Sequence, residues 1–311
     1  MVRTGFGYNK RRRTRRALIV LLVLAVAALI TYLAIRRGIG LFRAGTENIG
    51  NAVSISELWY DGQYADVVGI SEEILRDNPV DRDALLLAGY SRFFLAISRL
   101  SAEERNADLH ASIRHLRLLK ALGGTPNPER VDYILGKSYL LKGDYWADLA
   151  LRYLTASLDA GYQSDDSYEF IGKAYSALGE LDSALHWYEK AAESHPTDQL
   201  LLTLGEKAFN LGRYNDAAAY YIRAIESTRD ESLKKKGLSQ LGRLYYDIGN
   251  YALAREALET LVEMEVGNQD YQFLLAETYH ELGMDVDARR TWFIVTEINP
   301  RHVGALRRLY D

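Results

Sequence analysis

The chain has 311 residues, of which 48% are hydrophobic and 26% are charged, as is typical of a folded protein. It contains no cysteine, which excludes disulfides, thiolate zinc sites and cysteine nucleophiles. The net charge of −4 combines two opposite regions: residues 1–46 carry ten basic and no acidic side chains, whereas residues 47–311 carry 28 basic and 42 acidic ones. The second region therefore has a charge of −14, which disfavours nucleic acid as a partner and favours a basic protein.

An apolar segment follows the basic residues 1–16. It begins at Ala17 and ends at Ile35, so it has 19 residues. As a helix it would span roughly 28 Å, close to the ~30 Å hydrocarbon core of a bilayer. A cleaved signal peptide has a shorter apolar region of about 7–15 residues. We therefore predict an uncleaved signal-anchor, a single transmembrane helix over residues 17–35, with Tyr32 at the membrane interface.

The flanking charges predict the orientation of this anchor. Seven basic residues precede the segment, and three follow it before residue 47. Since basic residues stay on the cytoplasmic side, residues 1–16 should be cytoplasmic and the rest of the chain extracytoplasmic, facing a bacterial periplasm. Residues 36–47 are rich in glycine and should form a pliant juxtamembrane linker.

Five segments further along the chain share one pattern: LGKSYLLKGDY, IGKAYSALGEL, LGEKAFNLGRY, LGRLYYDIGNY and LAETYHELGMD. The first small residue in each is Gly136, Gly172, Gly205, Gly242 or Ala276. A second glycine follows seven residues later in every case. The small residue allows a neighbouring helix to approach, and the second glycine ends the first helix of a pair. The pattern predicts repeated antiparallel helix pairs, with all five prolines in the joints between pairs.

Residues 165–198 resemble the tetratricopeptide (TPR) repeat family almost completely. The matching positions are Ile171, Gly172, Tyr175, Gly179, Ala184, Tyr188, Ala191 and Pro196. The resemblance implies an all-α solenoid of about seven helix pairs, which we expect over residues 48–311. Residues from His302 onward should form the short C-terminal capping helix that the open end of a solenoid requires.

Two stretches depart from the repeat. Residues 82–122 lack the tight glycine turn, and the polar sequence LSAEERNADLHAS in its place predicts a lengthened loop, within which Ser101 and Glu104 have the spacing of a capping box. Residues 144–161 contain one or two extra residues, which should change the local rise of the stack.

The sequence offers no set of residues suited to catalysis. The six histidines are scattered, and we interpret them as surface or joint residues rather than metal ligands. There is no phosphate-binding glycine loop, H-E-x-x-H or G-x-S-x-G motif. We therefore expect no enzyme activity, no cofactor, no metal and no small-molecule substrate.

The family resemblance implies a binding groove lined by the first helix of each pair. The positions that map onto this groove are Tyr133, Lys137, Lys173, Glu206, Phe209, Arg243, Tyr246, Phe273 and His280. We expect the four aromatic residues in this set other than histidine to be exposed, so the groove would suit an extended peptide or an amphipathic helix. The set lacks the asparagine of the chaperone-binding carboxylate clamp. The alternative is that these residues are ordinary solvated helix faces.

Together these features predict a membrane-anchored scaffold for protein–protein interactions in a periplasmic assembly, such as a secretion, division or flagellar-motor complex. One alternative is a periplasmic holdase-type chaperone that binds exported proteins. Another is a cytosol-facing receptor on an organelle membrane, which would require the basic N-terminus to cross the membrane.

Overall fold

The computed structural model describes residues 55–310. The basic N-terminus, the anchor with Ala17, Tyr32 and Ile35, and the glycine-rich linker lie outside the described residues and stay predictions. Within residues 55–310, no helix is both long and apolar enough to cross a membrane.

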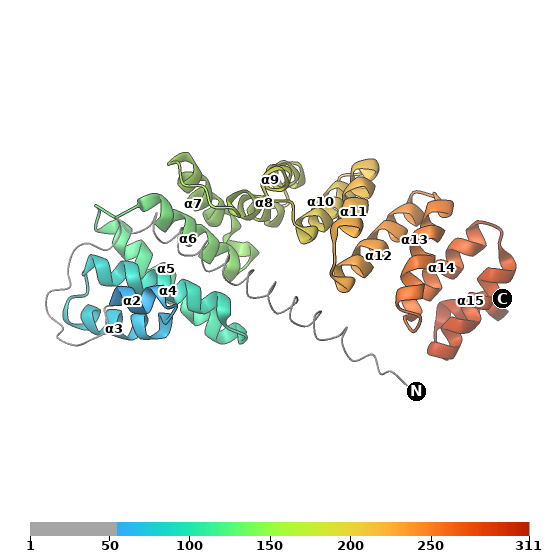
Figure 1. Ribbon diagram of the computed structural model, residues 1–311, viewed down its shortest axis with the longest axis horizontal. Coiled ribbons are helices and arrows are strands. Elements are labelled where there is room, and N and C mark those ends of the chain that lie inside the picture. The colour runs from blue at the N-terminus through green and yellow to red at the C-terminus, as the bar shows by residue number, and fades with distance from the viewer. Residues whose placement is uncertain (1–54, 311) are drawn as a thin grey trace, which may run out of the picture. The chain divides into compact units, whose positions relative to one another are not determined.

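The described part of the chain is built from helices, as predicted (Figure 1). It contains fifteen α-helices, a short 3₁₀ helix and no strand. It divides into two compact units, the first ending at Pro128 and the second beginning at Glu129. Fourteen of the α-helices form seven consecutive pairs, and the last helix stands alone. The predicted number of helix pairs is therefore confirmed for residues 55–310.

The first unit contains two helix pairs. They are α2 (Ile55–Tyr60) with α3 (Tyr64–Asp77), and α4 (Arg82–Ser98) with α5 (Ala102–Ala121). Each helix packs on the next. Phe93, Leu109 and Leu116 are fully buried in this unit.

The loop between α4 and α5 differs from the prediction. Only residues 99–101 separate the two helices, and the polar residues that follow form the first turns of a 20-residue helix. The Ser101 side chain accepts a hydrogen bond from the Glu104 backbone N–H at 3.4 Å. Because this cap and two glutamates stabilise a helix start, the polar sequence begins a helix instead of a lengthened loop.

The second unit contains five helix pairs and the capping helix. The pairs are α6 (Pro128–Lys142) with α7 (Ala147–Asp159), α8 (Ser167–Ala177) with α9 (Leu181–Ser194), α10 (Asp198–Asn210) with α11 (Tyr214–Ser227), α12 (Glu231–Asp247) with α13 (Tyr251–Met264), and α14 (Gln269–Glu281) with α15 (Asp285–Ile298). The capping helix is α16 (Val303–Tyr310), as predicted, and the extra residues before α7 form the 3₁₀ helix η2 (Asp144–Trp146). Four prolines lie between helices, and Pro128 is the first residue of α6, where its missing N–H costs nothing.

The two glycines of a repeat act as the sequence predicts. A methyl group on Gly205 in α10 would lie 2.3 Å from Cε1 of Tyr221 in α11, so only glycine permits this helix approach. Gly212 has a φ of 72°, and the Arg213 N–H next to it donates to the Ala208 carbonyl at 2.9 Å. This hydrogen bond closes the C-terminus of α10 and turns the chain into α11.

The first helices of successive pairs also contact one another. Helix α10 packs on α12, and α12 packs on α14, in addition to their contacts with the second helices. The first helices α10, α12 and α14 therefore form one layer, and side chains at equivalent positions follow each other along it.

Candidate interaction groove

At α6, two predicted groove residues are engaged within the chain. Tyr133 is only 6% exposed, and its hydroxyl donates to the Asp166 carboxylate just before α8. Lys137 Nζ lies 2.8 Å from Asp166 Oδ2 and 4.3 Å from the centre of the Phe170 ring. The expectation that Tyr133 is exposed is therefore wrong, because Asp166 of the next helix pair draws both side chains inward.

The electrostatics of this contact agree with its geometry. Burial alone would raise the pKa of Asp166, but hydrogen bonds from Lys137 and Tyr133 outweigh burial and lower it. Burial and the neighbouring carboxylate raise the pKa of the Tyr133 phenol. The contact therefore stays charged at neutral pH and joins α6 to α8.

The predicted groove residues in α8 and α10 are more exposed than Tyr133 in α6. Lys173 in α8 is exposed, with Nζ 2.6 Å from Glu169 Oε1. The Glu206 side chain in α10 is 47% exposed, and Oε1 lies 3.0 Å from Nζ of the adjacent Lys207. Phe209 is half-buried at the end of the same helix. These side chains lie at the surface of the first-helix layer.

The next first helix continues this open section. Arg243 in α12 is exposed and forms an ion pair with Asp247 one turn further on, at 3.1 Å. Tyr246 is half-buried, with its ring centre 5.5 Å from that of Tyr251 in an edge-to-face contact. The central groove thus presents both signs of charge beside aromatic rings.

The C-terminal end of the groove is tied to the capping helix. Glu277 in α14 is buried and accepts hydrogen bonds from Trp292 Nε1 at 3.0 Å and from Arg308 Nη2 at 2.7 Å. The half-buried Phe273 ring lies 4.7 Å, centre to centre, from His302, which precedes α16. The His280 ring lies 5.6 Å from Trp292. Phe273 and His280 therefore belong to the packed end of the stack.

Two buried tyrosines of the second helices pack against the first helices. Tyr188 in α9 and Tyr221 in α11 are each 3% exposed. Their rings cover Gly172 and Gly205 of the first helices. Burial first, and then nearby carboxylates, raise the pKa of both phenols: Glu169 and Glu206 act on Tyr188, and Glu206 acts on Tyr221. The signal in the sequence is that each tyrosine follows its glycine by sixteen residues.

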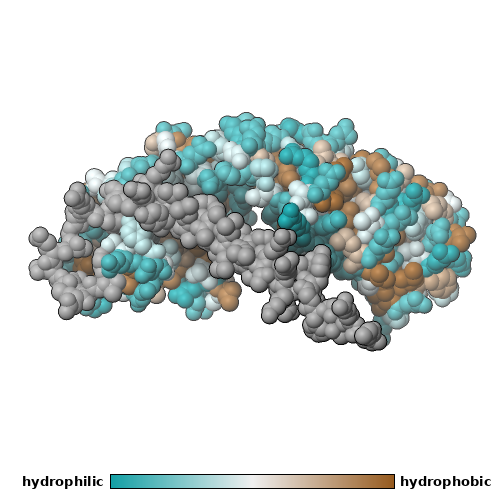
Figure 2. Space-filling view, viewed as in Figure 1, coloured by the Kyte–Doolittle hydropathy of each residue, from teal (hydrophilic) through white to brown (hydrophobic). Residues whose placement is uncertain are grey.

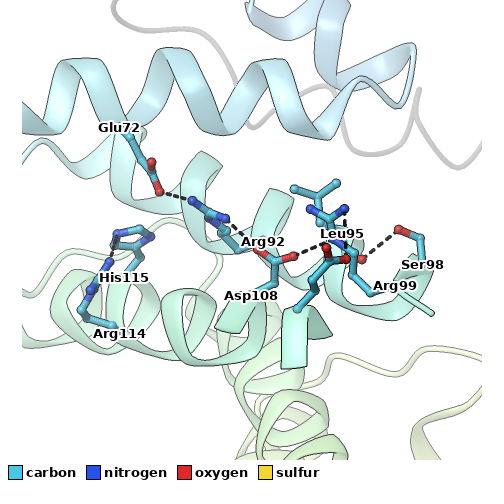
Figure 3. Close-up of polar contacts among 9 residues, drawn as sticks. Glu72, Arg92, Leu95, Ser98, Arg99, Asp108, Arg114 and His115 are labelled. Carbon is cyan, nitrogen blue, oxygen red and sulfur yellow. Dashed lines mark hydrogen bonds and ion pairs between the residues drawn. The ribbon is translucent and has the colours of Figure 1, made fainter. Parts of the chain in front are cut away.

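The first unit holds a polar cluster that the sequence analysis did not single out (Figure 3). Arg92 of α4 lies between Glu72 of α3, at 2.5 Å, and Asp108 of α5, at 2.6 Å. Arg99, seven residues after Arg92, donates to the other Asp108 oxygen at 3.1 Å. The Asp108 carboxylate is 4% exposed and satisfied by two arginines, so the cluster joins three helices and offers no open binding position.

His115, beside this cluster, is 7% exposed, so the interpretation of it as a surface or joint residue is wrong. Burial, reinforced by Arg114, lowers its pKa from 6.5 to about 4. In residues 55–310, no three or more histidine, aspartate or glutamate side chains are arranged to hold a metal ion.

Figure 2 shows hydrophilic side chains over much of the described surface on one face, with hydrophobic ones gathered over the C-terminal helices. Repeated helix pairs, with the first helices α10, α12 and α14 in contact, define a class of protein, the helical-repeat proteins that present extended binding surfaces.

Comparison with known proteins identifies the repeat itself. One tetratricopeptide repeat model matches residues 239–297, and a second matches residues 165–198 and 199–231. The match to residues 165–198 has the bounds of the segment that carries the resemblance in the sequence. The chain therefore contains tetratricopeptide repeats, as predicted.

One sequence relative and one solved structure show how far the similarity extends. The chain is 21% identical over 194 residues to the TPR repeat-containing protein YpiA of Bacillus subtilis. The aligned region covers 62% of this chain and 45% of YpiA. The chain thus spans less than half of YpiA. Its fold is similar to the C-terminal part of a TPR repeat-containing protein from Cytophaga hutchinsonii, with a TM-score of 0.63, 16% identity, and coverage of 83% of this chain and 98% of that one.

Proposed function

We propose that this protein is a membrane-anchored TPR scaffold that brings protein partners together at the extracytoplasmic face of a bacterial inner membrane. The observation that carries the proposal is the layer formed by the first helices α10, α12 and α14, whose Glu206 and Arg243 side chains are accessible to a partner. A TPR stack binds extended segments along such a layer. A secretion, division or flagellar-motor complex is the kind of assembly that would use it.

The anchor and its side of the membrane rest on the sequence. Residues 17–35 are long enough to span a bilayer, and the excess of basic residues before them favours a cytoplasmic N-terminus. The charge of −14 on the remaining chain keeps the repeats soluble and suits a basic partner.

The central groove favours a scaffold over a holdase-type chaperone. A holdase needs a broadly apolar surface for unfolded clients, whereas Lys173, Glu206 and Arg243 place charges at successive equivalent positions. Charged positions select partners by complementarity, so we expect few partners rather than many.

Cysteine labelling tests the side of the membrane. Because the native chain has no cysteine, Ser194→Cys in the exposed end of α9 and Thr14→Cys in the basic N-terminus each introduce a single thiol. In cells with a permeabilised outer membrane, a membrane-impermeant maleimide should label the first variant, and should label the second only after lysis. The reverse pattern would refute the proposed orientation and support a cytosol-facing receptor.

A further inference from the structure

One face of α3 is exposed along most of the helix. The buried residues of α3, which lie on its other side, are Val67, Val68 and Ser71. The exposed face presents, at helical spacing, Asp66, Gly69, Glu73 and Asp77. Within residues 55–310, none of these three carboxylates forms an ion pair or accepts a hydrogen bond. This face therefore carries three unpaired negative charges around a glycine.

Gly69 has no packing role within the described part of the chain. At each of the seven other helix glycines of residues 55–310, a methyl group would meet a neighbouring side chain at 2.9 Å or less. At Gly69 a methyl group would meet no atom within 4 Å. Glycine weakens a helix relative to alanine, and elsewhere in these helices it permits close packing. The open glycine in α3 thus points to a side chain that comes from another molecule.

The exposed face of α15 has a complementary composition. Its residues, again at helical spacing, are Val286, Arg289, Arg290 and Phe293. Val286 is 74% exposed and Phe293 is 46% exposed, and both belong to the hydrophobic side chains that gather over the C-terminal helices (Figure 2). Arg290 approaches Asp287 of its own helix at 3.6 Å, and Arg289 donates to a backbone carbonyl at 3.5 Å. Both arginines can therefore form closer ion pairs with a partner.

The two faces match in shape and in charge. Aromatic rings already cover helix glycines in this chain, since Tyr188 covers Gly172 and Phe273 covers Gly304. A Phe293 ring placed on Gly69 would repeat this contact. The two arginines beside the ring would then lie near the carboxylates beside the glycine, where charge-assisted hydrogen bonds can form.

We propose that α15 of one copy of this chain packs on α3 of a second copy, with Phe293 on Gly69 and the two arginines paired with the carboxylates of α3. Because the contact joins two different faces, each dimer keeps one unused face of each kind and can add further copies. At about 0.15 M salt, charges more than about 8 Å apart are largely screened, so the facing charges govern association. Neither face contains a predicted groove residue, so the inference does not depend on the proposed scaffold function.

Sedimentation velocity of the purified full-length chain in mild detergent, over a range of concentrations, tests this contact. We expect the native chain to form dimers and then larger species as the concentration rises. Gly69→Gln fills the open space on α3, and Arg289→Gln/Arg290→Gln removes the two charges from α15. Each variant should weaken association about tenfold or more without lowering the melting temperature.

Arg152→Gln/Arg223→Gln is the matched control for the charge. It removes two positive charges from exposed positions of α7 and α11, and it should associate as the native chain does. Equal weakening in this control and in Arg289→Gln/Arg290→Gln would show that net charge, rather than the α15 face, governs association, and would overturn the proposal.

An equimolar mixture of Gly69→Gln and Arg289→Gln/Arg290→Gln tests whether two different faces meet. The first variant keeps the α15 face, and the second keeps the α3 face, so one productive contact remains possible between them. The mixture should recover dimers but no larger species. A native chain that stays monomeric, native-like association of either variant alone, or a mixture that stays monomeric would each overturn the proposal.

Discussion

Gly205 is the residue on which one helix pair depends most directly. Gly205→Ala would place a methyl group 2.3 Å from the Tyr221 ring, so the ring or the helix must move. We expect a loss of about 1–3 kcal/mol in the free energy of unfolding, measured by chemical denaturation.

Gly69→Ala in α3 is the matched control, because a methyl group there meets no atom within 4 Å. In a helix interior with open space, alanine should be neutral or stabilise the protein by up to about 1 kcal/mol. A Gly205→Ala protein as stable as the native one would show that the two helices are not packed as described.

His115 gives the first unit a pH-dependent stability. Burial and then Arg114 lower its pKa from 6.5 to about 4, so the unfolded chain binds a proton that the folded chain does not. The contribution of His115 to the free energy of unfolding is therefore fully present above pH 6.5. As the pH falls toward 4, protonation of the unfolded chain lowers the free energy of unfolding by about 3 kcal/mol at most.

Denaturation of His115→Gln between pH 7 and pH 4.5 tests this contribution. The variant should lose less stability on acidification than the native protein, whereas His110→Gln, at an exposed position of the same helix, should behave like the native protein. Equal pH dependence of all three proteins would contradict the burial of a neutral His115.

At the scale of the element, Glu277 joins α14, α15 and the capping helix. Glu277→Ala removes the acceptor of Trp292 and the ion pair of Arg308, and we expect α16 to detach more readily, by about 2–3 kcal/mol. Hydrogen exchange of residues 303–310 measures this opening.

Glu281→Ala provides the comparison on the same helix. Glu281 is exposed one turn further on, so its removal should change exchange in α16 much less. If both variants protect α16 as well as the native chain does, the Glu277 contacts do not hold the capping helix.

The helix pairs could be predicted because each rests on local signals: a small residue for close packing, a second glycine for the turn, and prolines between pairs. The prediction of a lengthened loop after α4 was wrong for an equally local reason, because Ser101 and the glutamates after it start a helix. The groove was harder to predict. Tyr133 is buried because Asp166, 33 residues away, reaches it, and such a contact depends on the packing of two pairs.

At the scale of the whole molecule, we propose that the repeats hold a small number of specific protein partners through the groove. The number of partners distinguishes such a scaffold from a holdase, which would bind many clients weakly. A photo-crosslinking amino acid placed at Tyr246 in the groove, or at Glu226 on the exposed face of α11, measures this in the native membrane. For a specific scaffold, we expect one or two stoichiometric products from Tyr246 and none of them from Glu226. Many faint products from Tyr246, or the same products from both positions, would contradict it.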